Sequence, residues 1–578
     1  MRLVEIRLLE GPNVYRLEPV VKVEVAIGRR RTWYGQRTPG RHALVHLGAT
    51  VPRREWPSPV ESIVEWTRRL RVEHGEGRAG VVVHRSSDPG HWIITYPWTG
   101  AERAHTIAEA AISLAERDVS PVRRARLTGT QDRTLARWAA RIDEARTTPP
   151  SWIRDADRRM PAVSITGTNG KSTVTRLITH ILVKAGRRVG TTTSDGVLVN
   201  ERLVDAGDWT GPAGAMQILG RSDLDVAVLE TARGGLVLRG MGYESNEVSV
   251  VTNVTSDHLD LQGIHTLPEL AEVKSTVARV TKPDGWAVLN ADDPLVAAIA
   301  RRVRSRVALF TLMPGGSAAV RRLAAAGGRG YAVDDGWIVE LENKAERKIA
   351  EVGRVPITIG GLARHNVANA LAAAAAARGL GATIAQVTDG LVDFRPTADW
   401  SPGRLNLFRL GARIVIVDFA HNEAGVAAVL DVAEGIAGGA AGRAAPVTAI
   451  IGTAGDRPDD TLRGIAKIAA SRAQRVAIKE TLKYLRGRSR ESIVGELLAG
   501  VRAAGGSTAD VPIYESETIA LKAELADNEG RPRVIVLLSH EERDDVFRLL
   551  ETLGAKPIDI ASELTELVPR LQERPRRH

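Results

Sequence analysis

The 578-residue sequence contains no cysteine. Disulfide bonds, zinc–cysteine centres, iron–sulfur clusters and thiol nucleophiles are therefore all excluded. Any metal ion must be held by oxygen or imidazole ligands. The chemistry to look for is that of carboxylates, lysines, histidines and hydroxyl groups.

Long hydrophobic runs are also missing. The longest stretch of small apolar residues, 368–377, is interrupted by Asn369 and is far shorter than the roughly 20 residues that cross a membrane. The N-terminus carries Arg2, Glu5 and Arg7 and lacks the uninterrupted apolar core of a secretory signal. We therefore expect a cytoplasmic protein without membrane contacts.

Aromatic residues make up only 4% of the chain, and 79 basic against 69 acidic side chains give a formal net charge of +10. This charge is small for the length and is compatible with anionic small molecules or acidic polymers. Nucleic-acid binding is disfavoured, because no interleaved aromatic platform for stacked bases is visible. Hydrophobic residues, at 43%, suffice for several folded cores.

The residue patterns divide the chain into four regions. Residues 1–120 mix short alternating strands with helices and predict a small α+β module, and residues 121–157 predict an arginine-rich linker with a surface helix. From 158 to 398, apolar strand-like runs alternate with glycine-containing turns and helical stretches, a pattern typical of a parallel sheet covered by helices. Because the same pattern returns over 399–578, we expect two α/β domains in tandem.

A phosphate-binding loop follows the first strand of the third region. Glycine lets backbone N–H groups turn toward phosphate oxygens, and the helix that follows adds its positive end. Lys171 would neutralise the β- and γ-phosphates, and Ser172 or Thr173 would reach a magnesium ion. A strict Walker A spacing would place glycine where Ile165 stands, so the loop is a shortened variant. Its predicted nucleotide-binding residues are Gly167, Thr168, Asn169, Gly170, Lys171, Ser172 and Thr173.

The sequence TGTNGKST resembles the ATP-binding loop of the Mur ligase family, whose members form amide bonds with ATP. The motifs LETARGG, GDWTGP and GTAGDR are most similar to the Mur-ligase half of cyanophycin synthetases, and GPNVYRL resembles the start of their N-terminal domain. The resemblance covers roughly residues 160–560. Its motifs, in order, are LETARGG (229–235), VTNVTSDHLD (251–260), VLNADDP (288–294), GLARHNVANALAAA (361–374), PGRLNLF (402–408) and VDFAHNEAG (417–425).

Two departures from cyanophycin synthetases limit what the resemblance implies. Those enzymes carry an ATP-grasp domain where this chain has only the linker at 121–157, so we expect that it does not perform both of their half-reactions. In KETLKYLRGR, Leu482 and Lys483 stand where the resembled enzymes carry an acidic pair. The identity of the amino substrate is therefore left open.

The resemblance also implies roles for individual residues. Magnesium would be held by Ser172, Glu230, His258 and Lys274, the last of these as the lysine that many Mur ligases convert to a carbamate; Lys171, Glu230, His258 and Lys274 would be catalytic. The adenine of the nucleotide would be contacted by Asn290, His365, Asn366 and Asn369. Its phosphates and ribose would be contacted by Arg404 and Asp418 after domain closure. The substrates would be bound by Arg486, Arg488 and His421.

Simpler interpretations compete for some of these residues. Asn366 and Asn369 could cap a helix, and Arg486 and Arg488 could be solvated surface arginines. Lysines on helices, such as Lys274, are mostly solvated.

The sequence therefore predicts an ATP- and magnesium-dependent amide ligase that acts through an acyl phosphate. It would add arginine or another amino acid to an aspartyl-type carboxylate of a peptide or small molecule. The alternatives are a Mur-type ligase for an unrelated small metabolite, or a nucleotide-binding scaffold that partners a separate ATP-grasp enzyme. The oligomeric state is left open, and a homo-oligomer is compatible with the sequence.

Overall fold

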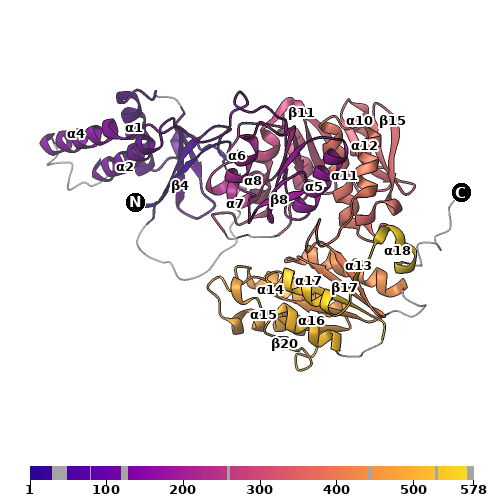
Figure 1. Cartoon of the computed structure of the whole chain (residues 1–578). Helices are drawn as coiled ribbons and strands as arrows, with labels where there is room; N and C mark the ends of the chain where they lie inside the picture. The colour runs from indigo at the N-terminus through magenta and orange to yellow at the C-terminus, as the bar shows by residue number, and fades with distance from the viewer. Residues whose placement is uncertain are drawn as a thin grey trace.

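In a computed structural model, the described residues form three β-sheets, each with its own helices, that follow one another along the chain. In Figure 1 the N-terminal unit lies at one end of the large central unit, and the C-terminal unit lies below it. The structure describes residues 1–28, 48–77, 80–118, 128–256, 259, 261–439, 445–526 and 531–568.

The N-terminal sheet is antiparallel, with the strand order β1-β2-β4-β3. Val21, Val23 and Val25 are buried, as their alternation predicts, but Lys22 and Glu24 between them are buried as well. These two charges are tolerated because they pair with each other and Lys22 also pairs with Glu5 of β1. The elements are β1 (Arg2–Leu9), β2 (Val20–Ala26), α1 (Ser58–Glu73), β3 (Val82–Arg85), β4 (His91–Pro97), α2 (Ala101–Asp118) and α4 (Thr128–Glu144).

The central sheet has eleven strands in the order β15-β14-β13-β12-β11-β10-β5-β9-β6-β7-β8. The seven strands from β13 to β6 are parallel, which confirms the predicted parallel sheet, whereas β14 with β15 and β7 with β8 add antiparallel edges. The strands are β5 (Ala162–Thr166), β6 (Val189–Thr192), β7 (Gly196–Val199), β8 (Arg202–Ala206), β9 (Val226–Glu230), β10 (Asn246–Val251), β11 (Thr281–Asn290), β12 (Arg306–Phe310), β13 (Arg329–Asp334), β14 (Trp337–Glu342) and β15 (Ala345–Glu351).

Helices cover both faces of the central sheet. Successive residues of a strand point to opposite faces, so Val163 and Ile165 pack with α5, α11 and α12, while Ala162 packs in the separate core that contains α6 and α8. The helices are α5 (Lys171–Lys184), α6 (Pro212–Leu219), α7 (Arg233–Leu238), α8 (Leu267–Arg279), α9 (Pro294–Ala297), α10 (Ala318–Ala325), α11 (Arg364–Gly379) and α12 (Ile384–Asp393).

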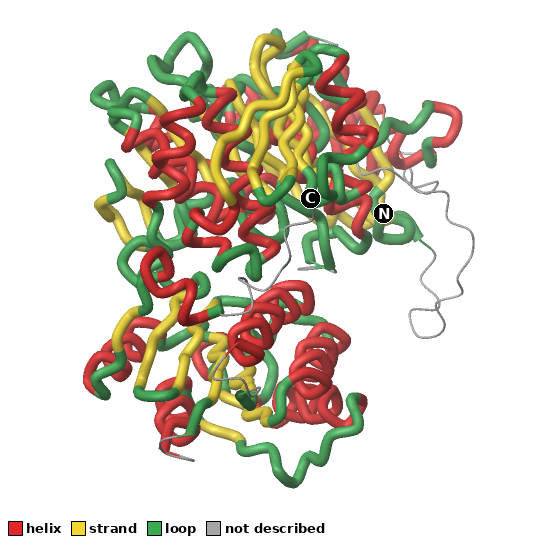
Figure 2. Tube along the Cα trace, turned by 90° about the vertical axis from the view of Figure 1, so that its right-hand side faces the viewer, coloured by secondary structure: helices red, strands yellow, loops and turns green. Residues whose placement is uncertain are grey.

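The C-terminal sheet has the order β20-β19-β18-β21-β17-β16-β22 and is parallel from β20 to β17. Figure 2 shows this sheet with its helices as a separate body below the larger one. Its elements are β16 (Asn406–Leu410), β17 (Arg413–Asp418), α13 (Glu423–Gly439), β18 (Val447–Ile451), α14 (Asp459–Arg472), β19 (Arg475–Lys479), α15 (Arg490–Ala503), β20 (Ile513–Tyr514), α16 (Glu517–Ala526), β21 (Arg533–Leu538), α17 (Arg543–Thr552), β22 (Lys556–Pro557) and α18 (Ile560–Leu567).

The C-terminal unit packs against the central unit through an apolar contact. Ile359 and Ala363, which both precede α11, are buried in the core of the C-terminal unit. The predicted domain limits at 120, 157 and 398 stay predictions. Within the described part of the chain, no helix is long and apolar enough to cross a membrane.

Candidate active site

The predicted phosphate loop connects the end of β5 to the start of α5. Gly167 and Gly170 have φ angles of 149° and 86°, a backbone region that other residues rarely adopt. A Cβ atom at Gly167 would lie 1.8 Å from Oγ1 of Thr252, and one at Gly170 would lie 2.4 Å from Oδ1 of Asn369. Both positions therefore need glycine, for backbone conformation and for space.

Residues that follow β10 hold the loop in place. Asn253 accepts a hydrogen bond from the Asn169 amide at 2.9 Å and donates through its side chain to the Asn169 carbonyl at 3.0 Å. Thr252 donates to the same carbonyl at 2.7 Å. Nζ of Lys171 donates to the Thr168 carbonyl at 2.9 Å, so the lysine side chain folds over the loop. Hydrogen bonds within the protein therefore fix the conformation of the loop.

Glu230 ends β9 directly beside this loop and is buried. Its Oε1 accepts a hydrogen bond from Ser172 at 3.1 Å, whereas its buried Oε2 has no hydrogen-bond partner among the described residues. Burial raises the pKa of Glu230, and the positive charges of Lys171 and Arg404 act against this rise. A buried carboxylate oxygen without a partner, next to a hydroxyl group, fits a magnesium ion.

Lys274 lies on α8 and is buried. Its Nζ donates to the Gly167 carbonyl at 2.7 Å, a contact that supports the loop, and the carbamate stays a prediction. Ser172, Glu230 and Lys274 line one cleft of about 930 Å³. The fourth predicted metal ligand, His258, lies outside the described residues.

Arg404 reaches the cleft from the C-terminal unit. Its Nη2 donates to Ser172 at 3.3 Å, and its guanidinium lies 5.0 Å from the centre of the Phe419 ring. Both carboxylate oxygens of Asp418 accept backbone amides, from Leu405 and Ala420, at 2.8 Å each. Asp418 therefore holds the two loops that present Arg404 and Phe419, and burial raises its pKa. Its contact with the ribose stays a prediction.

The residues predicted at the adenine already have protein partners. Asn290 donates to the Thr252 carbonyl at 2.8 Å, Asn366 donates to the Ile357 carbonyl at 3.0 Å, and Asn369 donates to Asn366 at 3.0 Å. Helix capping, the simpler interpretation of the last two, is wrong: α11 begins after Ala363, which makes no side-chain cap, and both asparagines lie inside the helix. The adenine role stays a prediction.

His365 is placed beside those asparagines at the start of α11. Burial lowers its pKa to about 4, so the imidazole is neutral at neutral pH. Its contact with the nucleotide stays a prediction.

The three residues predicted at the substrates are placed differently. Arg486 lines the cleft with a φ of 51°, and its guanidinium lies 5.3 Å from the centre of the Tyr484 ring. His421 also lines the cleft and contacts the Phe419 carbonyl through Nδ1 at 3.0 Å. Arg488 instead pairs with Asp459 at 2.8 Å and is not among the residues that line the cleft.

Sequence reasoning missed a bridge of ion pairs across the cleft. Asp195 pairs with Arg176 of α5 and with Arg543 of α17, each at 2.8 Å. Arg176 also donates to the carbonyl of Trp400 in the connection between the two units at 2.7 Å. Burial alone would raise the pKa of Asp195, but the two arginines lower it below its ordinary value. One carboxylate thus joins the phosphate-loop helix to the C-terminal unit.

A pair of amides makes a second contact between the same two units. Asn422 donates to Oδ1 of Asn169 at 2.9 Å, and Asn169 donates back to Oδ1 of Asn422 at 3.3 Å. Asn422 belongs to the VDFAHNEAG motif, but nothing in the sequence indicates its partner. The phosphate loop is therefore fixed directly to the C-terminal unit.

We expect Asp195→Asn to lower turnover about tenfold, because losing the charge weakens both ion pairs and shifts Arg404 relative to the phosphate loop. Steady-state ADP release and small-angle scattering would measure turnover and domain opening. Asp225→Asn is the control, since Asp225 pairs with Arg188 on the surface outside the cleft. Equal turnover in the two variants would contradict a role for the bridge.

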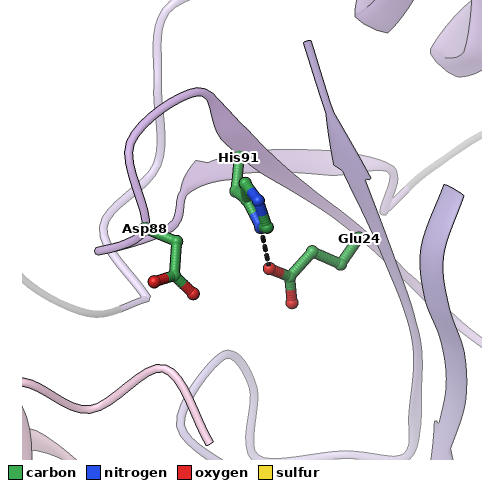
Figure 3. A group of neighbouring side chains, drawn as sticks. All are labelled: Glu24, Asp88 and His91. Atoms are coloured by element: carbon green, nitrogen blue, oxygen red, sulfur yellow. Dashed lines mark hydrogen bonds and ion pairs between the residues drawn. The ribbon is translucent and has the colours of Figure 1, made fainter. Parts of the chain in front are cut away.

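A second cluster of metal-ligating groups lies in the N-terminal unit. Figure 3 shows Glu24, Asp88 and His91, with His91 paired to Glu24 at 2.8 Å. Lys22 also pairs with Glu24 at 2.8 Å, and His265 of the central unit pairs with Asp88 at 3.0 Å. These partners balance the negative charge of the carboxylates. The cluster is therefore best explained as a contact between the N-terminal and central units.

Comparisons with known proteins agree with this geometry. Residues 165–377 match the Mur ligase middle domain. The chain is 41% identical over 347 residues to a cyanophycin synthetase of Crocosphaera subtropica, covering 60% of this chain and 39% of that protein. It is 38% identical over 401 residues to a cyanophycin synthetase of a Synechocystis species, covering 69% and 44%. The chain thus spans about two fifths of the length of these curated relatives.

A solved structure has the same fold. The complex of E. coli FolC with DHPP and ADP matches with a TM-score of 0.51 at 19% identity, over 68% of this chain and 89% of that chain. At this identity the likeness concerns the fold alone. The resemblance inferred from the motifs is confirmed by the match to residues 165–377 and by the two cyanophycin synthetases. The chain is therefore similar to the Mur ligase family, with the match to its middle domain spanning residues 165–377.

Proposed function

We propose that this protein is an ATP-dependent carbon–nitrogen ligase, which activates a carboxylate as an acyl phosphate and joins it to an amino acid. One observation carries the proposal. The phosphate loop, the unpartnered Oε2 of buried Glu230 and the guanidinium of Arg404 from the other unit meet in one cleft. Such a site concentrates positive charge and a metal-binding carboxylate around phosphate oxygens, as phosphoryl transfer requires.

The nucleotide would bind with its phosphates on the loop. Backbone N–H groups at the start of α5 and the ammonium of Lys171 would face the β- and γ-phosphates. Magnesium would be held by Ser172 and Glu230, and when bound it neutralises phosphate charge. Roles for His258 and for a carbamate on Lys274 belong to the same proposal, supported by the family resemblance.

The reaction would proceed in two steps. A carboxylate oxygen of the acceptor attacks the γ-phosphorus, the bond to the bridging oxygen breaks, and ADP leaves. The amine nitrogen of the donor then attacks the carbonyl carbon, phosphate leaves with the electrons of the C–O bond, and the nitrogen loses a proton. The contacts of Arg404 with Ser172 and of Arg543 with Asp195 close the cleft and would keep water from the acyl phosphate.

For the substrates we propose an aspartyl-type carboxylate as acceptor and arginine or another amino acid as donor. Similarity to two cyanophycin synthetases supports this choice. The cleft wall of the C-terminal unit carries both signs of charge, since Arg486, Arg548, Glu541 and Asp544 all line it. Such a wall suits a zwitterionic amino acid and a carboxylate.

The test is product analysis with purified protein, ATP, magnesium, a β-aspartyl peptide and single amino acids. We expect ADP formation to depend on the acceptor carboxylate, steady release of ADP and phosphate when the amine is also present, and one amide added without elongation of the peptide backbone. AMP formation or backbone elongation would refute the mechanism. Strong activity with a non-basic amine would refute only arginine as donor.

A further inference from the structure

The two glycines of the motif GTAGDR (452–457) make room for other residues. Neither has a positive φ, so the backbone conformation does not require glycine. A Cβ atom at Gly452 would lie 2.3 Å from the carbonyl oxygen and 2.8 Å from Cε of Lys479. A Cβ atom at Gly455 would lie 2.1 Å from the carbonyl oxygen of Leu485. The motif therefore accommodates a lysine side chain and the turn that follows this lysine along the chain.

The lysine beside Gly452 forms an enclosed ion pair with Glu517. Lys479 ends β19 and Glu517 begins α16, and their side chains, 0% and 1% exposed, meet at 2.6 Å. Burying two charges is costly, and apolar residues of similar volume often stabilise a fold as well or better. Stability alone therefore does not explain the pair. Neither residue lines the cleft, so neither contacts a substrate there.

We propose that this pair positions the amine donor, because it fixes the two loops that form the C-terminal wall of the cleft. The inference rests on the proposed ligase function and deepens it. In that reaction the acyl phosphate forms beside the phosphate loop of the central unit. The amine nitrogen therefore approaches from the wall that the C-terminal unit contributes. Lys479 and Glu517 act through the residues that they hold in this wall.

The first of the two loops follows β21 and is folded around the carboxylate of Glu517. Oε1 accepts the backbone amides of His540 and Glu541 at 2.6 and 3.0 Å, and Oε2 accepts the amide of Glu542 at 3.1 Å. Oε2 also accepts the hydroxyl group of Ser539 at 2.6 Å. Burial alone would raise the pKa of Glu517, but the ammonium beside it and these hydrogen bonds lower it below its ordinary value. All four loop residues line the cleft.

Lys479 also fixes the proton of the His540 imidazole. Its Nζ lies 3.0 Å from Nδ1 and has only protons to offer, so Nδ1 accepts and Nε2 donates to the Ala420 carbonyl at 3.1 Å. Burial and the neighbouring ammonium lower the pKa of His540, so the ring is neutral at neutral pH. The ring lies 5.2 Å from that of Phe419, whose other contact is the guanidinium of Arg404 at 5.0 Å. The ion pair thus also supports the aromatic contact of Arg404.

The second loop connects β19 to α15 and is held by Glu541. Its Oε1 accepts the backbone amides of Lys483 and Tyr484 at 2.7 and 3.1 Å. The Tyr484 carbonyl accepts the amide of Gly455 at 2.8 Å, which fixes the same turn from the other side. The turn leads to Arg486, which lines the cleft and contacts the Tyr484 ring. The buried pair is therefore connected to Arg486 through one loop and one turn.

The experiment compares two glutamates of the same helix, α16. Glu517→Gln keeps the volume of the side chain but removes the charge that holds the loop. Glu524→Gln is the matched control, because Glu524 is also buried, pairs with Arg475 at the other end of β19 at 2.7 Å and does not line the cleft. The double variant Lys479→Met/Glu517→Gln removes both charges and replaces Glu517→Gln if the single variant does not fold. Thermal melting establishes that each variant is folded.

Steady-state kinetics separate a positioning role from a structural one. The acceptor is the β-aspartyl peptide, and the amine is the amino acid that gives the wild type its highest turnover. We expect Glu517→Gln and the double variant to raise KM for the amine about tenfold, and to change kcat and KM for ATP less than about threefold. Glu524→Gln should melt at a lower temperature but keep KM for the amine within about twofold of the wild type. An unchanged KM for the amine in Glu517→Gln, or an equal rise in Glu524→Gln, would overturn the inference.

Hydrogen exchange tests the connection to the second loop without any substrate. We expect the amides of Lys483 and Tyr484 to exchange about tenfold faster in Glu517→Gln than in the wild type, and at the wild-type rate in Glu524→Gln. Equal exchange in Glu517→Gln and the wild type would overturn the connection. If no carboxylate and amine together release ADP from the wild type, the ligase function is refuted. Hydrogen exchange then decides by itself whether the pair fixes this wall.

Discussion

Replacing Lys171 by alanine is expected to lower ATP turnover by about 10² to 10³-fold while the protein stays folded. Lys171 begins α5 and is not buried in a core, and its ammonium donates to the carbonyl of Thr168 within the phosphate loop. In the proposed reaction this charge would stabilise the negative charge that moves onto the leaving ADP. The loss should therefore appear in kcat more than in stability.

Lys184, at the opposite end of the same helix, provides the control. It pairs with Asp393 on the surface at 3.2 Å and is not among the residues that line the cleft. Lys184→Ala should leave turnover within about twofold of the wild type, because an exposed ion pair contributes little. Circular dichroism and ADP release measured on both variants separate folding from catalysis. Near-normal turnover in Lys171→Ala would contradict the prediction that this loop binds the phosphates of ATP.

The phosphate loop and the parallel core could be predicted because their signals are local. The loop needs a strand, two glycines and a lysine within one short segment, and each parallel strand is a run of apolar residues. Because these strands are buried on both faces, they appear in the sequence as continuous runs of apolar residues. The predicted α/β class is therefore confirmed where the sheet is parallel.

The antiparallel edges of the central sheet were not predicted, although a signal exists. Asn200 and Glu201, between β7 and β8, both have positive φ, and so do Asn343 and Lys344 between β14 and β15. Two such residues form the tight turn of a β-hairpin, and asparagine at the first position is a known preference. Reading these pairs as turns would have identified both hairpins.

The contacts across the cleft had no comparable signal. Asp195 and Arg543 are 348 residues apart, and Asn169 and Asn422 are 253 apart. Each looks like an ordinary solvated residue in its own segment, because its partner is supplied by packing of two separately folded units. Arg404 was identified only through the family resemblance, for the same reason.

Glu230→Gln is expected to lower turnover by about 10²-fold and to raise the magnesium concentration needed for half-maximal activity about tenfold. Glutamine keeps the volume and can still accept the hydrogen bond from Ser172, but it offers magnesium no negative charge. Magnesium titrations followed by ADP release would measure both effects. Titrations indistinguishable from the wild type would refute Glu230 as a metal ligand.

Glu272→Gln is the matched control, since Glu272 is also a buried carboxylate of the central unit but pairs with Arg302 and Arg279 and does not line the cleft. It should lower the melting temperature, because an arginine loses its partner, and leave the magnesium midpoint unchanged.

Glu230→Gln should have the opposite effect on stability. Burial raises the pKa of Glu230, so the folded protein disfavours the charged carboxylate, and a neutral amide removes that cost. Without magnesium, the melting temperature of Glu230→Gln should therefore exceed that of the wild type at neutral pH. Adding magnesium should stabilise the wild type more than the variant, because only the carboxylate gains a cation. If the variant melts at a lower temperature than the wild type without magnesium, the Glu230 carboxylate stabilises the fold and the prediction is contradicted. Higher stability together with lost turnover is the result expected for a residue whose charge is needed for catalysis.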